Sequence, residues 1–308
     1  MTRSGWSLIA ALCLLAGCAG PGTGTREEIL LSRFEQAELG TPQLRLHVID
    51  VGQGDAILLQ APGGKTALID TGPAGARRTL LDYLRTHNVR RIDLLIHSHA
   101  HADHVGNTPA VLRNFEVGAV LDPGYAHPAK AYARALSAIE ASKIPMKRAR
   151  RGRTIRMGPH VRLKILGPEE PFLRQTRSDV NANSVVLRID FEDVRILLTG
   201  DAEHETEQRL LQHGKAPLRA QVLKIAHHGS RFASKRPFLA AVAPTLALVS
   251  AGRENAYGHP HKGTIKRLSA RGTAVAITGR DGHLVLETDG RALRLYRGER
   301  GRNGPATD

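Results

Sequence analysis

The stretch "LLIHSHAHADHVGN", from Leu94 to Asn107, places four histidines and one aspartate directly after a run of aliphatic residues. An imidazole is polar at one edge and titrates near neutral pH, so a cluster of them is costly to bury without partners. One interpretation is a solvated loop whose composition is accidental. The other is that a cation lies among the rings.

The spacing within this stretch favours a metal site. His99 and His101 are two residues apart, and in an extended segment such side chains project to the same side. If the chain turns into a helix near Asp103, then Asp103 and His104 point elsewhere and can serve a second ion. Imidazole and carboxylate groups are good ligands for Zn, Mn or Fe. His97 precedes the array on the strand, and we expect it to pack or to support the ligands.

Two later segments supply further candidate ligands at the ends of apolar runs. "ILLTGDAE" ends in Asp201, whose carboxylate could bridge two cations, and "LKIAHHGS" ends in His227 and His228. Each signal is weak alone, because an aspartate after a strand is often a helix cap. Together with the first array they predict a metal centre.

The composition is that of a globular chain with a strong positive charge. The 308 residues are 41% hydrophobic and 24% charged, and 44 Lys and Arg against 29 Asp and Glu give a net charge of +15. This charge favours anionic partners such as nucleic acid, a phosphorylated polymer or a membrane surface. The alternative is that abundant Arg merely keeps the surface soluble.

The N-terminus resembles an export signal. Arg3 is followed by an apolar run from Trp6 to Leu15, which is short for a membrane span. "LAGC" resembles a bacterial lipobox, so residues 1–17 are predicted to be a lipoprotein signal peptide and Cys18 the lipidated first residue. An uncleaved anchor helix is the alternative. We therefore expect an extracytoplasmic protein, periplasmic or on the cell surface, that is anchored to the membrane through Cys18. Because Cys13 and Cys18 are the only cysteines, the mature chain has no disulfide and no thiolate ligand.

The rest of the chain is organised around one domain. Residues 18–43 are rich in Gly, Thr, Pro and charge, and are predicted to form a tether with a short helix around residues 27–38. Residues 44–296 alternate between strand-like and helix-like segments, which predicts a single layered α/β domain. Residues 297–308 are predicted to be a basic, mobile tail.

The chain resembles the metallo-β-lactamase (MBL) superfamily, and within it the ComEC/Rec2-related branch of competence proteins. The resemblance rests on "HVIDVGQGDAILLQ", "TALIDTG", "HSHAHADHVGN", "NANSVVLRI", "LLTGDAE", "LKIAHHGS" and "NAYGHPH". It implies a four-layer αβ/βα sandwich with two divalent metal ions at one edge of the sheets. By this resemblance, His99 and His101 would bind the first metal and Asp103 and His104 the second. Asp201 would bridge the two metals.

The resemblance also assigns supporting residues and leaves one gap. One of His227 and His228 would complete the second site, with His228 favoured, and Asp70 would support the metal loop. Many family members supply another histidine to the first metal, but here that position falls near "NANSVV". Asn183 or Ser184 could reach a metal-bound water or the substrate, although both are poor ligands for Zn. The metal is therefore expected to be Zn or Mn, with its identity open.

Two loops carry further candidates for contact with substrate. "DVGQGDA" is a Gly-rich turn from which Gln53 and Asp55 could line the cleft, although it could equally be a structural hairpin. "ENAYGHPH" offers Asn255 and Tyr257, and it could place His259 at the phosphate or the leaving group. The alternative for this second loop is a simple turn that leads into a helix.

These features predict an exported, binuclear metal-dependent hydrolase, most simply a phosphodiesterase or nuclease that cuts DNA with a metal-activated hydroxide. Two adjacent cations suit in-line attack on phosphorus, with Asp103 and Asp201 at the metals. The proton donor would be His259, or whichever of His227 and His228 is not a ligand. The segment from Lys147 to Lys164 carries eight Lys or Arg residues that could contact a polyanion without reading its sequence. The alternatives are a phosphorylcholine-type or small-ester or lactam hydrolase, and a non-catalytic DNA-binding lipoprotein that takes part in DNA uptake. No obligate protein partner is inferred.

Overall fold

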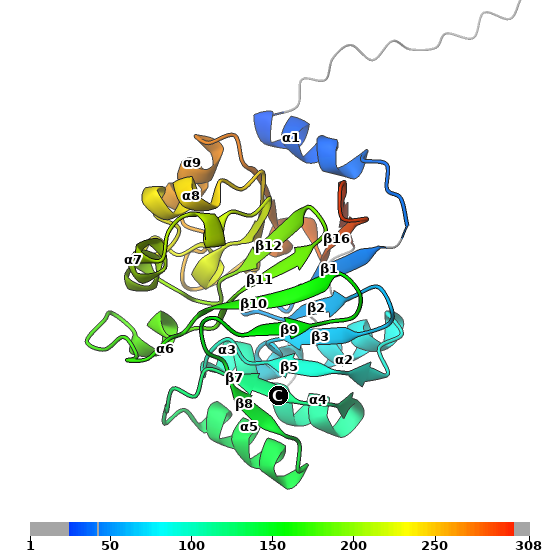
Figure 1. Cartoon of the computed structure of the whole chain (residues 1–308), viewed down its shortest axis with the longest axis vertical. Helices are drawn as coiled ribbons and strands as arrows, with labels where there is room; N and C mark the ends of the chain where they lie inside the picture. The colour runs from blue at the N-terminus through cyan, green and yellow to red at the C-terminus, as the bar shows by residue number, and fades with distance from the viewer. Residues whose placement is uncertain (1–24, 42, 299–308) are drawn as a thin grey trace, which may run out of the picture.

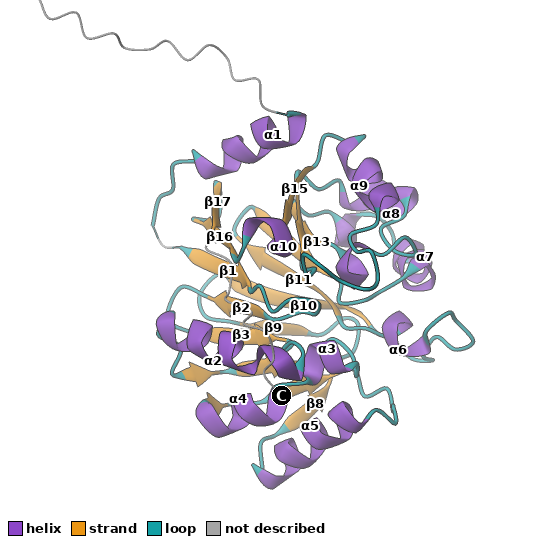
Figure 2. Ribbon diagram, turned by 180° about the vertical axis from the view of Figure 1, so that it is seen from behind, coloured by secondary structure: helices purple, strands orange, loops and turns teal. Residues whose placement is uncertain are grey.

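The computed structural model describes residues 25–41 and 43–298, which fold into two facing β-sheets with helices on both outer sides (Figures 1 and 2). The first sheet has the strand order β17-β16-β1-β2-β3-β5-β7-β8 and the second has the order β15-β14-β13-β12-β11-β10-β9. In each sheet one half is parallel and the other half is antiparallel, and β4 (Arg91–Ile92) and β6 (Glu116–Val117) pair separately.

The strands of the first sheet are β17 (Leu293–Arg297), β16 (Leu284–Thr288), β1 (Leu44–Val48), β2 (Ile57–Gln60), β3 (Thr66–Ile69), β5 (Leu94–Ile96), β7 (Val120–Asp122) and β8 (Met146–Arg148). Those of the second sheet are β15 (Ala274–Ile277), β14 (Leu246–Val249), β13 (Val222–Lys224), β12 (Val194–Leu198), β11 (Val186–Phe191), β10 (Val161–Gly167) and β9 (Thr154–Arg156).

Three hydrophobic clusters separate the four layers. The largest lies between the two sheets, and the period-two pattern of β10 shows why: Val161, Leu163 and Ile165 enter this core while Arg162 and Lys164 point outward. A second cluster joins the first sheet to α2 (Arg77–Thr86), α4 (Thr108–Asn114) and α5 (Lys130–Ala141). A third joins the second sheet to α7 (His204–Gln212), α8 (Arg236–Val242) and α9 (Lys262–Ser269). The predicted four-layer αβ/βα sandwich is confirmed.

The N-terminal helix α1 (Arg26–Glu35) belongs to the folded body. Thr25 and Glu28 form a reciprocal capping box that starts the helix. Leu31 is 1% exposed and belongs to the core between the sheets, and Glu27 pairs with Arg280 at 2.8 Å. Figure 1 shows the helix lying across the end of the sandwich at which β16 lies. The assignment of residues 18–43 to a tether was therefore wrong for this part, because burial of Leu31 ties the segment to the domain.

Several predicted features lie outside the described residues. These are the signal peptide at 1–17, the lipidation site Cys18 and the tail beyond Gly298. Among residues 25–41 and 43–298, no helix combines the length and the apolar character needed to cross a bilayer.

The topology brings the candidate ligands to one edge. Strands β3, β5 and β7 of the first sheet are mutually parallel, as are β12 and β13 of the second. Loops after parallel strands meet at the carboxyl edge of a sheet, where α/β proteins build their ligand sites. Asp70 follows β3, the histidine array follows β5, Asp201 follows β12 and His227 follows β13.

Candidate metal centre

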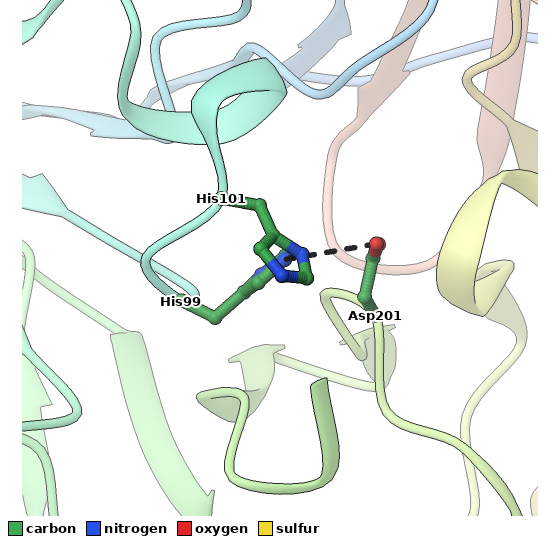
Figure 3. Close-up of side chains that lie close together, drawn as sticks. All are labelled: His99, His101 and Asp201. Atoms are coloured by element: carbon green, nitrogen blue, oxygen red, sulfur yellow. Dashed lines mark hydrogen bonds and ion pairs between the residues drawn. The ribbon is translucent and has the colours of Figure 1, made fainter. Parts of the chain in front are cut away.

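Two neighbouring groups of side chains present metal-ligand atoms to one another. His99, His101 and Asp201 form the first triad, with ligand atoms that all lie within 4.8 Å of one another. Figure 3 shows both rings turned toward the Asp201 carboxylate, and His99 Nε2 is 3.7 Å from Asp201 Oδ2. The second triad consists of the following residues: Asp103, His104 and His228. The structure thus brings together six of the seven residues that the sequence proposed as ligands.

Asp201 lies between the two triads. Its Oδ1 is 3.4 Å from His104 Nε2, and its Oδ2 is 3.7 Å from His228 Nε2. The carboxylate of Asp103 faces the same point, with Oδ2 3.3 Å from His228 Nε2. An Asp201 carboxylate in this place could bridge two cations, which is the role predicted for it.

The unpaired atoms of this region fit a cation. His104 Nε2, Asp201 Oδ1, His228 Nε2 and Asp55 Oδ1 are buried and accept or donate no hydrogen bond within the described residues. Buried polar atoms are nearly always paired, and four orphans at one place call for a partner. Carboxylate oxygen and imidazole nitrogen are donors that divalent Zn, Mn or Fe takes. The residues present therefore fit a metal centre.

Hydrogen bonds on the far side of the rings fix the orientation of the ligands. His104 Nδ1 donates to Asp70 Oδ2 at 2.7 Å, so Nε2 faces the centre. Asp70 also accepts the backbone N–H of Ser98 at 2.7 Å and the Ser98 hydroxyl at 2.6 Å. His97 is fully buried between Asp122 and Thr108, to which its two ring nitrogens bond at 3.1 and 3.0 Å. It is a packed residue, because both nitrogens are already used.

The structure separates the roles of His227 and His228. His228 is 1% exposed, donates from Nδ1 to the carbonyl of Ser250 at 2.9 Å and turns Nε2 into the second triad. His227 is more exposed and bonds through Nδ1 to Glu203 Oε1 at 2.7 Å. Its Nε2 lies 3.7 Å from Asp201 Oδ2, so it borders the centre without joining either triad.

Protons and cations compete for the same atoms in this centre. Burial would lower the pKa of the His104 ring, but the carboxylates of Asp201 and Asp103 hold it well above its usual range. Burial would likewise raise the pKa of the Asp201 carboxyl, but His104 and His228 hold it well below the usual range. A metal that binds here must displace ring protons, so its affinity will fall as the pH falls.

Three residues proposed for substrate contact are buried, and for them the prediction was wrong. The Asn183 side-chain amide forms its hydrogen bonds with backbone groups of Leu173 and Asp179, and the side chain is 1% exposed. Ser184 is fully buried and its hydroxyl accepts the backbone N–H of Asp201 at 3.2 Å. Asp55 is 1% exposed and ion-paired to Lys224. A polymer cannot reach these groups.

The other candidates lie nearer the surface. Gln53 Oε1 accepts the Gly252 N–H at 3.4 Å, and Asn255 holds its own loop through Gly252 and His259. Tyr257 is 71% exposed, with its ring stacked 5.7 Å from that of His259. Burial, together with the neighbouring His227 and His228, lowers the pKa of His259 to about 4. His259 is therefore a neutral hydrogen-bonding group at pH 7, which argues against its predicted role as a cationic acid.

Sequence reasoning missed three residues around the centre. Glu203 is 2% exposed, accepts from the Arg177 guanidinium at 2.9 Å and orients His227. Lys224 is fully buried, and an ionisable residue that ends the apolar run "QVLK" was its visible signal. Asn181 is 2% exposed, with Nδ2 3.5 Å from His227 Nδ1 and with Oδ1 unpaired within the described residues. Nothing in its local sequence distinguishes it from Asn183.

Comparison with known proteins agrees with this geometry. The sequence profile described as the Metallo-beta-lactamase superfamily matches residues 49–253, and the chain belongs to that superfamily. ComE operon protein 3 of Bacillus subtilis is 28% identical over 253 residues, which make up 76% of this chain and 32% of that protein. Competence protein ComA of Neisseria gonorrhoeae is 32% identical over 242 residues, which make up 77% of this chain and 31% of that protein.

The chain spans about a third of the length of these relatives. Among solved structures, the metallo-beta-lactamase fold protein YhfI from Bacillus subtilis superposes with a TM-score of 0.52 at 14% identity, covering 79% of this chain and 99% of YhfI. At that identity the likeness shows the fold alone. Together the family and the His/Asp cluster make this chain a metal-dependent hydrolase of the superfamily.

Proposed function

We propose that this chain is an exported, lipid-anchored, binuclear phosphodiesterase that cleaves DNA. The observation that carries the proposal is the pair of adjacent triads with Asp201 between them. Two divalent ions bound there would activate water and neutralise charge on a phosphate undergoing in-line displacement. Zn and Mn both suit the mixed imidazole and carboxylate donors.

The chain's own residues have definite tasks in this scheme. Asp70 and Ser250 hold His104 and His228 with Nε2 toward the centre. His259 is partly exposed, and its ring lies 5.5 Å from that of His227 and 6.4 Å from that of His228, so it could hydrogen-bond a phosphate oxygen at the centre. A neutral ring can donate from one nitrogen, which positions a phosphate without supplying a cationic acid.

The basic run supports a polyanionic substrate. Strands β7 and β8 are parallel and Arg148 is the register partner of Asp122, so the end of β8 lies at the same edge as the histidine array. Within the described residues, five exposed cations of this run have no carboxylate partner: Lys147, Arg148, Arg153, Arg156 and Arg162. A carboxylate neutralises each of the other three, among them Arg150 with Glu170 at 2.6 Å. Unpaired surface cations such as these can bind a phosphate backbone. Arg148 lies at the metal edge, whereas Arg156 and Arg162 are register partners near the amino end of β10, toward the opposite edge.

The cellular setting rests on the sequence and on the relatives. Export and attachment through Cys18 follow from the N-terminal pattern alone. The match to a relative named as a competence protein fits a DNA substrate.

Incubation of the purified mature chain with linear and circular DNA tests the proposal. The panel contains Mn, Zn, Mg and a chelator, and the variants are Asp201→Ala and the exposed-carboxylate control Asp193→Ala. We expect metal-dependent cleavage by the wild type and by Asp193→Ala, and none by Asp201→Ala. Cleavage of a small chromogenic ester with DNA left intact would show that the substrate is a small ester and not DNA. DNA binding without cleavage under every metal would make the chain a binding protein.

A further inference from the structure

A buried ion pair lies directly behind the second triad. Lys224 is fully buried, and its ammonium donates to Asp55 Oδ2 at 2.6 Å and to the carbonyl of Ile225 at 3.1 Å. The other carboxylate oxygen, Asp55 Oδ1, is 3.4 Å from His228 Nδ1 and forms no hydrogen bond within the described residues. The pair therefore uses one oxygen of Asp55 and leaves the other free.

Such a pair needs a reason beyond stability. Desolvation of two charges is expensive, and well-packed hydrophobic residues of similar size often serve as well or better. Lys224 is at the end of a strand whose neighbours Val222 and Leu223 are core residues. The charged pair therefore occupies a place where apolar side chains would pack, directly behind the second triad.

The free oxygen of Asp55 faces the metal centre. Asp55, His104 and Asp201 have ligand atoms that lie within 4.8 Å of one another, and one atom of each of the three is unpaired within the described residues. The backbone N–H of Asp55 donates to the carbonyl of Asp103 at 3.2 Å, which ties Asp55 to the segment that carries two ligands of the second triad. The turn can approach Asp103 this closely because Gly54 has no side chain, as a Cβ there would lie 2.3 Å from the Asp103 oxygen.

We propose that Asp55 is a further ligand of the second metal and that Lys224 limits the negative charge it brings. The second site then has three carboxylates, Asp55, Asp103 and Asp201, beside the imidazoles of His104 and His228. Oxygen-rich donor sets suit Mn better than they suit Zn. The Lys224 ammonium attracts the same carboxylate that would bind the metal, so it weakens metal binding. In the metal-free protein it stabilises the fold, because it pairs with the buried charge of Asp55. This inference rests on the metal centre of the proposed function and is independent of the substrate.

Metal binding without substrate tests the proposal. Mn titrations followed by electron paramagnetic resonance give the stoichiometry and the affinity of each site, and a chromophoric chelator gives the same quantities for Zn. The test variants are Lys224→Met and the charge-free double variant Asp55→Asn/Lys224→Met. The matched control is Asp93→Asn/Lys65→Met, which removes an ion pair of 2.8 Å that is more exposed and lies at the start of β5.

The two test variants should change metal affinity in opposite directions. The double variant should bind the second Mn at least tenfold more weakly, the size of loss seen when groups close to a metal are removed. Its bound-Mn spectrum should also change, which a merely structural pair would not cause. Lys224→Met alone should bind that Mn more tightly although its metal-free form melts at a lower temperature. The control should bind both ions as the wild type does.

Three results would overturn the inference. These are a double variant with wild-type affinity and spectrum, a Lys224→Met variant that loses affinity as the double variant does, and a wild type that binds fewer than two ions. If Lys224→Met does not fold, the double variant alone decides, because it leaves no unpaired charge. A wild type that binds two Mn ions with the expected Asp55 effect and cuts no DNA would refute only the proposed function.

Discussion

Gly54 is the position at which the smallest change should do the most damage to the metal centre. Its φ of 140° belongs to a region that residues with side chains rarely adopt. A Cβ at this position would lie 2.3 Å from the carbonyl oxygen of Asp103 and 2.9 Å from Pro73 Cδ. Because the first of these atoms is backbone, Gly54→Ala must move the turn or the segment that carries Asp103.

The cost follows from two separate effects. Backbone strain at such a φ costs about 1–3 kcal/mol. Overpacking by one methyl group in a filled interior costs about 1–3 kcal/mol more. The free energy of unfolding should therefore fall by about 2–6 kcal/mol, and since a chain of this size loses about 2–4 °C in Tm per kcal/mol, the melting temperature should fall by at least about 4 °C.

Urea unfolding and metal titration together test this prediction, with Gly75→Ala as the control. Gly75 is nearby in the turn Ala74–Ala76, and a Cβ there meets no atom within 4 Å. We expect Gly75→Ala to unfold like the wild type and to bind the same amount of metal. Gly54→Ala should be less stable and should bind the second metal more weakly, since Asp103 shifts. Equal unfolding free energies and equal metal contents for the two variants would refute the argument.

Three further predictions concern other parts of the chain. Leu31→Ala should lower the free energy of unfolding, measured in urea, by about 2–5 kcal/mol, because the side chain is 1% exposed. A loss of stability smaller than that of Leu30→Ala, which alters a partly buried neighbour, would contradict the docking of α1. Burial raises the pKa of Glu207 from 4.5 to about 7, so its contribution to stability is complete below pH 4.5 and is lost as the pH rises through 7. At 1.4 kcal/mol per pKa unit the loss is at most about 3.5 kcal/mol. Urea unfolding of Glu207→Gln from pH 4 to pH 8 should lack this loss, and a pH dependence parallel to that of the wild type would disprove it. His259→Gln keeps a hydrogen-bond donor, so kcat/KM on a phosphodiester in steady-state assays should fall by no more than about tenfold, which corresponds to the loss of one hydrogen bond. A fall of a hundredfold or more would show that His259 acts as a proton donor after all.

The residues of the two triads could be predicted because their signals are local. His99 and His101 are two residues apart, and Asp201 and His228 each follow an apolar run that becomes a parallel strand. The rule that loops gather at the carboxyl ends of parallel strands then places them together without further information. The layered α/β fold was predictable because strand-like and helix-like segments alternate along the chain.

The surroundings of the ligands were not predictable in this way. Asp55 and Lys224 are 169 residues apart, so no local pattern relates the two halves of their ion pair. Asn183 and Ser184 are polar residues within the motif "NANSVV", and only the packed structure shows that their side chains point inward to backbone groups. Leu31 is buried because α1 packs against β15 and β17, edge strands of the two different sheets, and no local pattern indicates this packing.

The turn after β13 shows how the two kinds of information combine. His227 and His228 both have left-handed backbones, with φ of 49° and 52°, and such strain persists only where the surroundings hold it. The backbone N–H of His227 donates to Gly200, next to Asp201, and Gly229 accepts from His261 in the loop that carries His259. A Cβ on Gly229 would lie 2.5 Å from Pro260 Cβ, so glycine is required where the two loops touch. The sequence offers the two histidines as alternative candidate ligands. The contacts with two distant loops decide that His228, and not His227, turns its Nε2 into the second triad.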